Sequence, residues 1–107
     1  MKNYKVYWAN SAKYDLESII EYIKLDSIDL AKDIFLQIKQ ACDNLYTFPN
    51  RGQIVPELKS IGVLKYREII FKSWRIVYKI DKDIVYILLV ADSRRNLEDI
   101  LFERLIK

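Results

Sequence analysis

The sequence predicts an α+β protein, in which a hairpin of two antiparallel helices packs on one face of a mostly antiparallel sheet of about four strands. Two periods and one connection lead to this fold class. Apolar residues recur with a helical period before residue 47 and with a period of two after residue 64. All the glycines and prolines lie between residues 49 and 62, so one long connection, about 47–63, separates the two patterns.

The part of the chain before this connection is expected to form a strand and then the helical hairpin. Residues 3–9 are typical of a strand that can pair beside the central strand of the sheet. Apolar stripes run through Ala12–Ile23 and Ala31–Leu45, and the short link between them predicts an antiparallel hairpin over about 11–46. Both helices have side chains that can cap their starts: Asn10 or Ser11 for the first, and Asp26 or Ser27 for the second.

The part after the connection is expected to form three strands and a short helix. The strands are Lys65–Phe71, Ser73–Asp81 and Ile84–Ala91, which are rich in β-branched and aromatic residues. Short links between them predict consecutive antiparallel pairing. The last strand is apolar on both faces and is expected to be central. Asn96 then begins a short C-terminal helix.

Composition limits the class of protein. A chain of 107 residues that is 51% hydrophobic predicts one domain, residues 1–107, with an ample core. No apolar run approaches the roughly 18–20 residues of a membrane span, and the first residues lack the apolar core of a signal peptide. The single cysteine, Cys42, is expected in the core and suits a reducing cytoplasm. Because histidine is absent, we expect no metal and no cofactor.

Positive charge is concentrated in the second half of the chain. Residues 59–80 contain six Lys or Arg against one Asp or Glu. Such a patch favours a polyanion or an acidic protein as partner. A solvated, lysine-rich surface would also explain the lysines, but it explains less well the four arginines Arg67, Arg75, Arg94 and Arg95.

The basic residues of the strands are the candidates for binding a target. Alternation puts Arg75 and Lys79 on one face of their strand, and Lys65 and Arg67 on one face of the neighbouring strand. Antiparallel pairing is expected to bring Arg67, Arg75 and Lys79 together, and such a cluster repels itself unless an anion or a carboxylate lies among them. The candidate target-binding residues are Lys65, Arg67, Arg75, Lys79, Arg94 and Arg95.

Each candidate also has a structural interpretation. Arg75 could pair with Glu68 or with a helix carboxylate, and so hold the sheet to the helical hairpin. Arg94 and Arg95 follow the end of the central strand. They could cap it by pairing with the carboxylates nearest to them in the sequence, which are Asp92, Glu98 and Asp99.

Five local motifs follow one another along the chain. They are A-x-x-D-L-x-x-I-x-x-Y-I at residues 12–23, L-x-x-x-P at 45–49, Y-R-E at 66–68, W-R-I-V-Y at 74–78 and R-R-N at 94–96. Together, across about 95 residues, they resemble the RelE/ParE superfamily, the toxins of type II toxin–antitoxin systems. The order of the expected elements matches too, so the resemblance implies the fold of that superfamily.

The resemblance implies one of two activities. Members similar to RelE cleave mRNA in the ribosomal A site, using basic residues on the sheet and a C-terminal tyrosine or histidine. Members similar to ParE lack that set of residues and inhibit DNA gyrase. Both kinds imply a cognate antitoxin, whose flexible acidic or amphipathic segment covers the basic sheet and the helical hairpin.

The ribonuclease pattern is incomplete when it is carried over residue by residue. Arg75 matches the arginine of the third strand, and Arg67 stands where one catalytic lysine is found. Arg94 or Arg95 matches the arginine after the last strand. The position of a second lysine falls on Ile69, and the terminal tyrosine has no counterpart.

Proton-transfer chemistry favours the same conclusion. RNA cleavage needs one group to accept the 2′-hydroxyl proton and another to protonate the leaving oxygen. Without histidine the candidates are Glu68, Tyr66 or a lysine, because arginine is a poor proton shuttle. We therefore expect a ParE-like inhibitor of DNA gyrase. The alternative is a RelE-like endoribonuclease with the ribosome and mRNA as partners, and with Arg67, Arg75 and Arg94 as its catalytic contacts.

Overall fold

The computed structural model describes residues 4–106 and confirms the α+β fold class. The strands are β1 (Lys5–Trp8), β2 (Gln53–Ile54), β3 (Tyr66–Phe71), β4 (Trp74–Asp81) and β5 (Ile84–Asp92). The helices are α1 (Asn10–Lys24), α2 (Ile28–Asp43), α3 (Pro56–Lys59) and α4 (Glu98–Leu101), which continues into a π-helical turn, Phe102–Ile106. The strands form one sheet in the order β1–β5–β4–β3–β2.

The strands pair as the sequence predicts, with one addition. β3, β4 and β5 are consecutive antiparallel neighbours, and β1 pairs in parallel with β5, where Lys5 lies opposite Ile84. The first strand is shorter than the predicted 3–9, and residue 3 lies outside the described residues. The addition is β2, which lies inside the predicted connection and pairs with β3. Two residues are too few to show a period, so the sequence did not indicate this fifth strand.

The helical hairpin is confirmed, as is one of the two predicted N-caps. Ser27 caps α2, since its Oγ accepts a backbone N–H at 3.1 Å. The prediction for α1 was wrong, because Ala9 takes the cap position and Asn10 is already helical. Ser11 instead donates its hydroxyl proton to the backbone carbonyl of Leu88, 3.4 Å away in β5. The start of α1 is therefore tied to the sheet and not to its own first turn.

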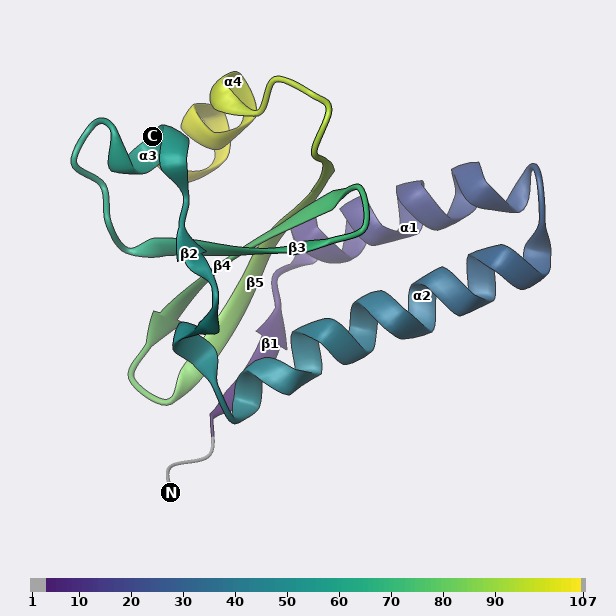
Figure 1. Ribbon diagram of the computed structural model, residues 1–107, viewed down its shortest axis with the longest axis horizontal. Helices are drawn as coiled ribbons and strands as arrows, with labels where there is room; N and C mark the ends of the chain where they lie inside the picture. Colours follow the sequence, from purple (N-terminus) through teal and green to yellow (C-terminus); the bar gives the residue numbers. More distant parts are fainter. Residues whose placement is uncertain (1–3, 107) are drawn as a thin grey trace.

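The sheet is covered on both faces, which gives three layers (Figure 1). The hairpin of α1 and α2 covers one face, over a core that includes Leu16, Ile38 and the predicted core residue Cys42. The short helices α3 and α4 cover the other face, over a second core that includes Leu58 and Leu101. In Figure 1 the far half of the hairpin extends past the strands. Among the helices described within residues 4–106, none combines the length and the apolarity needed to cross a bilayer.

A β-bulge in β5 changes which side chains face which core. Val77 of β4 lies opposite Leu89, whereas the next residue, Tyr78, lies opposite Ile87, so Leu88 is an extra residue in β5. Odd-numbered residues of β5 face the hairpin before the bulge, and even-numbered residues face it after the bulge. Each face of this strand therefore packs against one of the two cores, which explains why the strand is apolar on both faces.

The connection between α2 and β3 is fixed to the sheet by polar contacts. The buried hydroxyl of Tyr78 donates to the carbonyl of Pro49 at 2.6 Å and accepts the N–H of Gly52 at 3.0 Å. Arg67 donates to the carbonyl of Gly52 at 2.6 Å. A Cβ atom on Gly52 would lie 2.5 Å from the carbonyl oxygen of Glu68, so only glycine fits this close approach of two backbones.

Candidate functional site

Arg75 lies in a polar cluster formed by β3, β4 and α3, on the face of the sheet opposite the hairpin. Its Nη1 and Nη2 atoms donate to the two carboxylate oxygens of Glu57 at 2.6 and 2.7 Å, and its Nε donates to Glu68 at 2.7 Å. Gln53 of β2 donates to the other oxygen of Glu68 at 2.7 Å. Only 8% of Arg75 and 2% of Glu68 are exposed. Every nitrogen of the guanidinium therefore has a carboxylate partner within the protein.

This Arg75 cluster confirms the structural interpretation of Arg75 and corrects one detail. The predicted partner Glu68 is present, but the helix carboxylate is Glu57 of α3, so Arg75 holds the sheet to α3 and not to the hairpin. Hydrogen bonds from Arg75 lower the pKa of Glu57, and hydrogen bonds to Glu57 and Glu68 raise the pKa of Arg75. Because two carboxylates surround one guanidinium, the cluster offers no net positive charge to a phosphate.

The predicted meeting of Arg67, Arg75 and Lys79 does not occur, and the pairing register gives the reason. Arg67 lies opposite Tyr78, and Arg75 lies opposite Ile70, so Arg67 and Arg75 project from opposite faces of the sheet. Lys79 shares the face of Arg75, where its Nζ lies 5.7 Å from the centroid of an aromatic ring on β5. These three basic side chains therefore do not form a single basic patch on the sheet.

The two side chains named as proton-transfer candidates are engaged elsewhere. Glu68 is buried in the Arg75 cluster. Tyr66 is also buried, and its hydroxyl donates to the carbonyl of Leu105 at 3.2 Å. The exposed Lys65 places its Nζ 5.3 Å from the centroid of the Tyr66 ring. Across residues 4–106, no group of three or more Asp, Glu or Cys side chains is placed to hold a metal ion.

Arg94 and Arg95 line a cleft of about 400 Å³ between α1, the adjoining ends of β4 and β5, and the C-terminal turn. We call it the Trp74 cleft, and its lining includes Tyr14, Asp15, Tyr22, Trp74, Arg94 and Arg95. Arg94 pairs with Asp92 at 3.1 and 2.7 Å, as the capping interpretation predicts, and this holds the pKa of Asp92 at about 2. Arg95 contacts Asp92 through its backbone N–H, at 3.1 Å from the carbonyl oxygen.

A third arginine at the Trp74 cleft was not indicated by the sequence. Arg104 donates to both carboxylate oxygens of Asp15 at 2.8 and 2.7 Å, and Asp15 also accepts the backbone N–H of Val90 at 3.1 Å. The hydrogen bonds to Asp15 raise the pKa of Arg104. They also tie the C-terminal turn to α1. The motif at residues 12–23 contains Asp15, but its partner is 89 residues further along, so no local pattern could reveal the pair.

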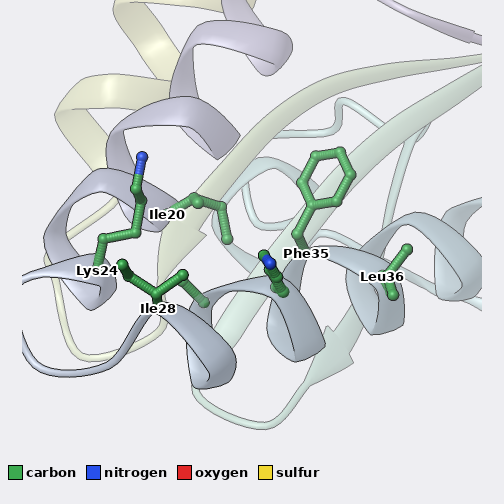
Figure 2. A pocket seen from close by; sticks show the side chains of 7 residues that line it. Ile20, Lys24, Ile28, Phe35 and Leu36 are labelled. Atoms are coloured by element: carbon green, nitrogen blue, oxygen red, sulfur yellow. The ribbon is translucent and has the colours of Figure 1, made fainter.

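The second concave surface is an apolar groove along the helical hairpin, with a volume of about 540 Å³. Figure 2 shows that its walls come from both helices, with Ile20 and Lys24 from α1 and Ile28, Phe35 and Leu36 from α2. We call it the hairpin groove, and its lining includes Ile20, Lys24, Ile28, Lys32, Phe35 and Leu36. Ile28, Phe35 and Leu36 are exposed although they are large and apolar. Apolar side chains gathered in this way are typical of protein-binding surfaces.

Comparison with known families identifies the class of protein. Residues 6–97 match the family described as the ParE toxin of the type II toxin–antitoxin system, parDE. The match spans most of the chain, so this protein belongs to the ParE toxin family of type II toxin–antitoxin systems. The resemblance inferred from the five motifs is thereby confirmed, including its closeness to the ParE branch. No curated protein matches the chain in sequence.

Three solved structures have a similar fold. The chromosomal ParDE system from P. aeruginosa has a TM-score of 0.69 and 18% identity, over 83% of this chain and 95% of that chain. The RelBE2 complex from Mycobacterium tuberculosis has a TM-score of 0.59 and 20% identity, over 86% and 93%. A free mutant of the E. coli toxin RelE has a TM-score of 0.62 and 17% identity, over 97% and 95%. Identities this low relate the folds alone.

Proposed function

We propose that this toxin inhibits DNA gyrase and that a cognate antitoxin neutralises it. The observation that carries the proposal is the Arg75 cluster. Arg75, which matches the third-strand arginine of RelE-like ribonucleases, is held there by Glu57 and Glu68. Cleavage of RNA requires free cations beside the scissile phosphate and a general acid and base within reach of it. With Arg75 occupied and both Glu68 and Tyr66 buried, a binding mode of action is the better supported one.

A RelE-like endoribonuclease is the second candidate, because the fold is also similar to that of RelE. It would use Arg67, Arg75 and Arg94 as contacts to mRNA on the ribosome. For that, Arg75 must leave both of its carboxylates, and Arg67 must reach the opposite face of the sheet. These two requirements count against the endoribonuclease.

A comparison of purified protein in two assays separates these candidates. We expect the toxin to inhibit supercoiling by gyrase and to leave mRNA intact during translation in vitro, and we expect the antitoxin to reverse the inhibition. Cuts in mRNA at codon boundaries, with supercoiling unaffected, would overturn the proposal. The Arg94→Ala variant can be compared with the unchanged toxin in both assays, because Arg94 is exposed and its removal leaves the buried clusters intact.

For the antitoxin, the hairpin groove is the surface that we propose it covers. An amphipathic helix could place its apolar side chains against Ile28, Phe35 and Leu36, and acidic residues at its edges could reach Lys24 and Lys32. This would remove exposed apolar surface from the far half of the hairpin (Figure 1). We expect a short reading frame next to the toxin gene to encode this antitoxin.

A matched pair of substitutions tests the role of the hairpin groove. Leu36 is 64% exposed in the groove, and Leu64 is 57% exposed outside it. Leu36→Glu is expected to weaken antitoxin binding by roughly tenfold or more, because it puts a charge where an apolar contact is needed. Leu64→Glu is expected to leave the affinity unchanged. Equal affinities for the two variants would show that the antitoxin binds elsewhere.

A further inference from the structure

The Trp74 cleft combines exposed aromatic rings with arginine side chains. Tyr14 and Tyr22 are eight positions apart on α1, so they lie on the same side of the helix about two turns apart, and they are 70% and 75% exposed. The same cleft is lined by Trp74 of β4, which is half-buried, and by Arg95, which is exposed. Neither tyrosine contributes to the two cores on the faces of the sheet, so core packing does not explain why these positions are aromatic.

The walls of this cleft are fixed by hydrogen bonds. Asp15 binds both Arg104 and the backbone of Val90, which joins α1, β5 and the C-terminal turn. Arg94 is held by two hydrogen bonds to Asp92 at the end of β5. A surface whose parts are already in place loses little conformational freedom when a partner binds. The walls of the cleft therefore need little further ordering when a partner binds.

The charges in the cleft select the chemistry of the partner. Arg94 and Arg104 are each neutralised by a carboxylate, whereas Arg95 has no carboxylate within ion-pair distance among residues 4–106. A strand of nucleic acid needs several unpaired cations along its backbone, whereas Arg95 is the one lining arginine without a carboxylate partner among residues 4–106. Tyrosine, tryptophan and arginine are the residues that carry most of the binding energy at protein–protein interfaces.

We propose that the Trp74 cleft binds a segment of the target protein that carries a carboxylate beside an apolar side chain. The carboxylate pairs with Arg95, and the apolar side chain packs between Trp74 and the rings of Tyr14 and Tyr22. This inference rests on the proposed function, because it assigns the cleft to the inhibited target and leaves the hairpin groove to the antitoxin. The two surfaces have separate linings, so each can be changed alone.

Two cleft variants and two matched controls test the assignment. The cleft variants are Tyr22→Ala and Arg95→Glu. The controls are Tyr46→Ala and Arg51→Glu, which change an exposed tyrosine and an exposed arginine outside the cleft. Three quantities are compared with the unchanged toxin: growth arrest on expression, affinity for purified gyrase, and affinity for the antitoxin. Retained antitoxin binding shows that a variant is folded.

We expect each cleft variant to lose growth arrest and to bind gyrase roughly tenfold or more weakly, with antitoxin binding unchanged. The controls are expected to match the unchanged toxin in all three measurements. If the cleft variants still arrest growth, the assignment of the cleft is wrong, whatever the target. If they lose growth arrest but the unchanged toxin does not bind gyrase, the cleft stands and the proposed gyrase target fails.

A nucleic-acid ligand is the competing outcome, and it has its own measurement. Anisotropy of a labelled single-stranded oligonucleotide reports direct binding to the toxin. Binding that is lost in Arg95→Glu and falls steeply with added salt would replace the protein segment by a polyanion. Unchanged anisotropy, together with weakened gyrase binding, supports the protein segment.

Discussion

The carboxylate of Asp15 in α1 accepts the backbone N–H of Val90 in β5, at a distance of 3.1 Å. β1 pairs with β5 only as far as Ile87, so within residues 4–106 no strand pairs with this side of β5 beyond that point. The helix that follows β1 supplies side chains in its place, with Ser11 at the carbonyl of Leu88 and Asp15 at the N–H of Val90. The end of β5 that β1 does not reach is in this way covered by a helix.

Substitution of Asp15 should separate its two contacts. Asp15→Ala leaves the N–H of Val90 unpaired and part-buried, which should lower the free energy of unfolding by about 1–3 kcal/mol. Arg104→Ala removes the ion pair and leaves the hydrogen bond to Val90, so it should cost less than Asp15→Ala. Urea denaturation of both variants measures the difference. Equal losses would mean that the contact with Val90 adds nothing.

Substitution of Arg75 should act on stability as well as on toxicity. Arg75→Ala leaves Glu68 buried without its counter-charge, and breaking a buried pair in this way costs about 3–5 kcal/mol. Arg94→Ala, at an exposed arginine, should leave the midpoint of urea denaturation nearly unchanged. Loss of toxicity in Arg75→Ala would therefore report catalysis only if the denaturation midpoint were unchanged, which we do not expect.

The stability that Glu57 contributes should depend on pH. Its pKa lies below the ordinary value of 4.5 because Arg75 donates hydrogen bonds to it, so the folded state holds its proton less tightly than the unfolded state. The contribution is fully present above about pH 4.5, and it is lost as the pH falls through the lower pKa of the folded state. Glu57→Gln should be less stable than the unchanged protein near neutral pH.

The difference between Glu57→Gln and the unchanged protein should also shrink as the pH is lowered. Urea denaturation from about pH 7 to about pH 3 measures it. A difference that stays constant over this range would show that the charge of Glu57 is not what Arg75 recognises. Glu103→Gln, at an exposed carboxylate outside the Arg75 cluster, serves as the control.

The single thiol should be unreactive in the folded protein. Burial raises the pKa of Cys42 to about 12, and the thiolate is the form that reacts with alkylating agents. Iodoacetamide should therefore modify Cys42 only when the protein unfolds, at a rate that rises with urea. A Ser93→Cys variant supplies an exposed thiol for comparison. Rapid modification of Cys42 without denaturant would contradict this burial.

Much of the fold could be predicted, because long elements carry their periods in the sequence. The stripe Ala31–Leu45 and the alternation in Ser73–Asp81 each extend over enough residues to fix a helix and a strand. β2 and α3 could not be predicted, since two and four residues show no period. The bulge at Leu88 could not be predicted either, because an apolar strand looks the same with one residue more.

The candidate site was less predictable, because it depends on register and on distant partners. Alternation correctly placed Arg75 and Trp74 on opposite faces of their strand. Only the register of β3 against β4 shows that Arg67 lies on the face opposite to Arg75. Arg104 has no local signal at all, since its partner lies in the first helix. Tyr14 and Tyr22 could have been noticed, because both fall outside the apolar stripe of their helix.

The fit of Gly52 against the sheet has a consequence for the order of folding. Its slot is made by the carbonyl of Glu68 and the hydroxyl of Tyr78, which belong to strands that come later in the chain. Pulse-labelled hydrogen exchange during refolding should therefore find the N–H of Gly52 protected after the amides of β3 and β4. During synthesis on the ribosome, the connection around Gly52 cannot dock on the sheet until residue 78 has emerged. A segment from the middle of the chain is therefore among the last to reach its native position.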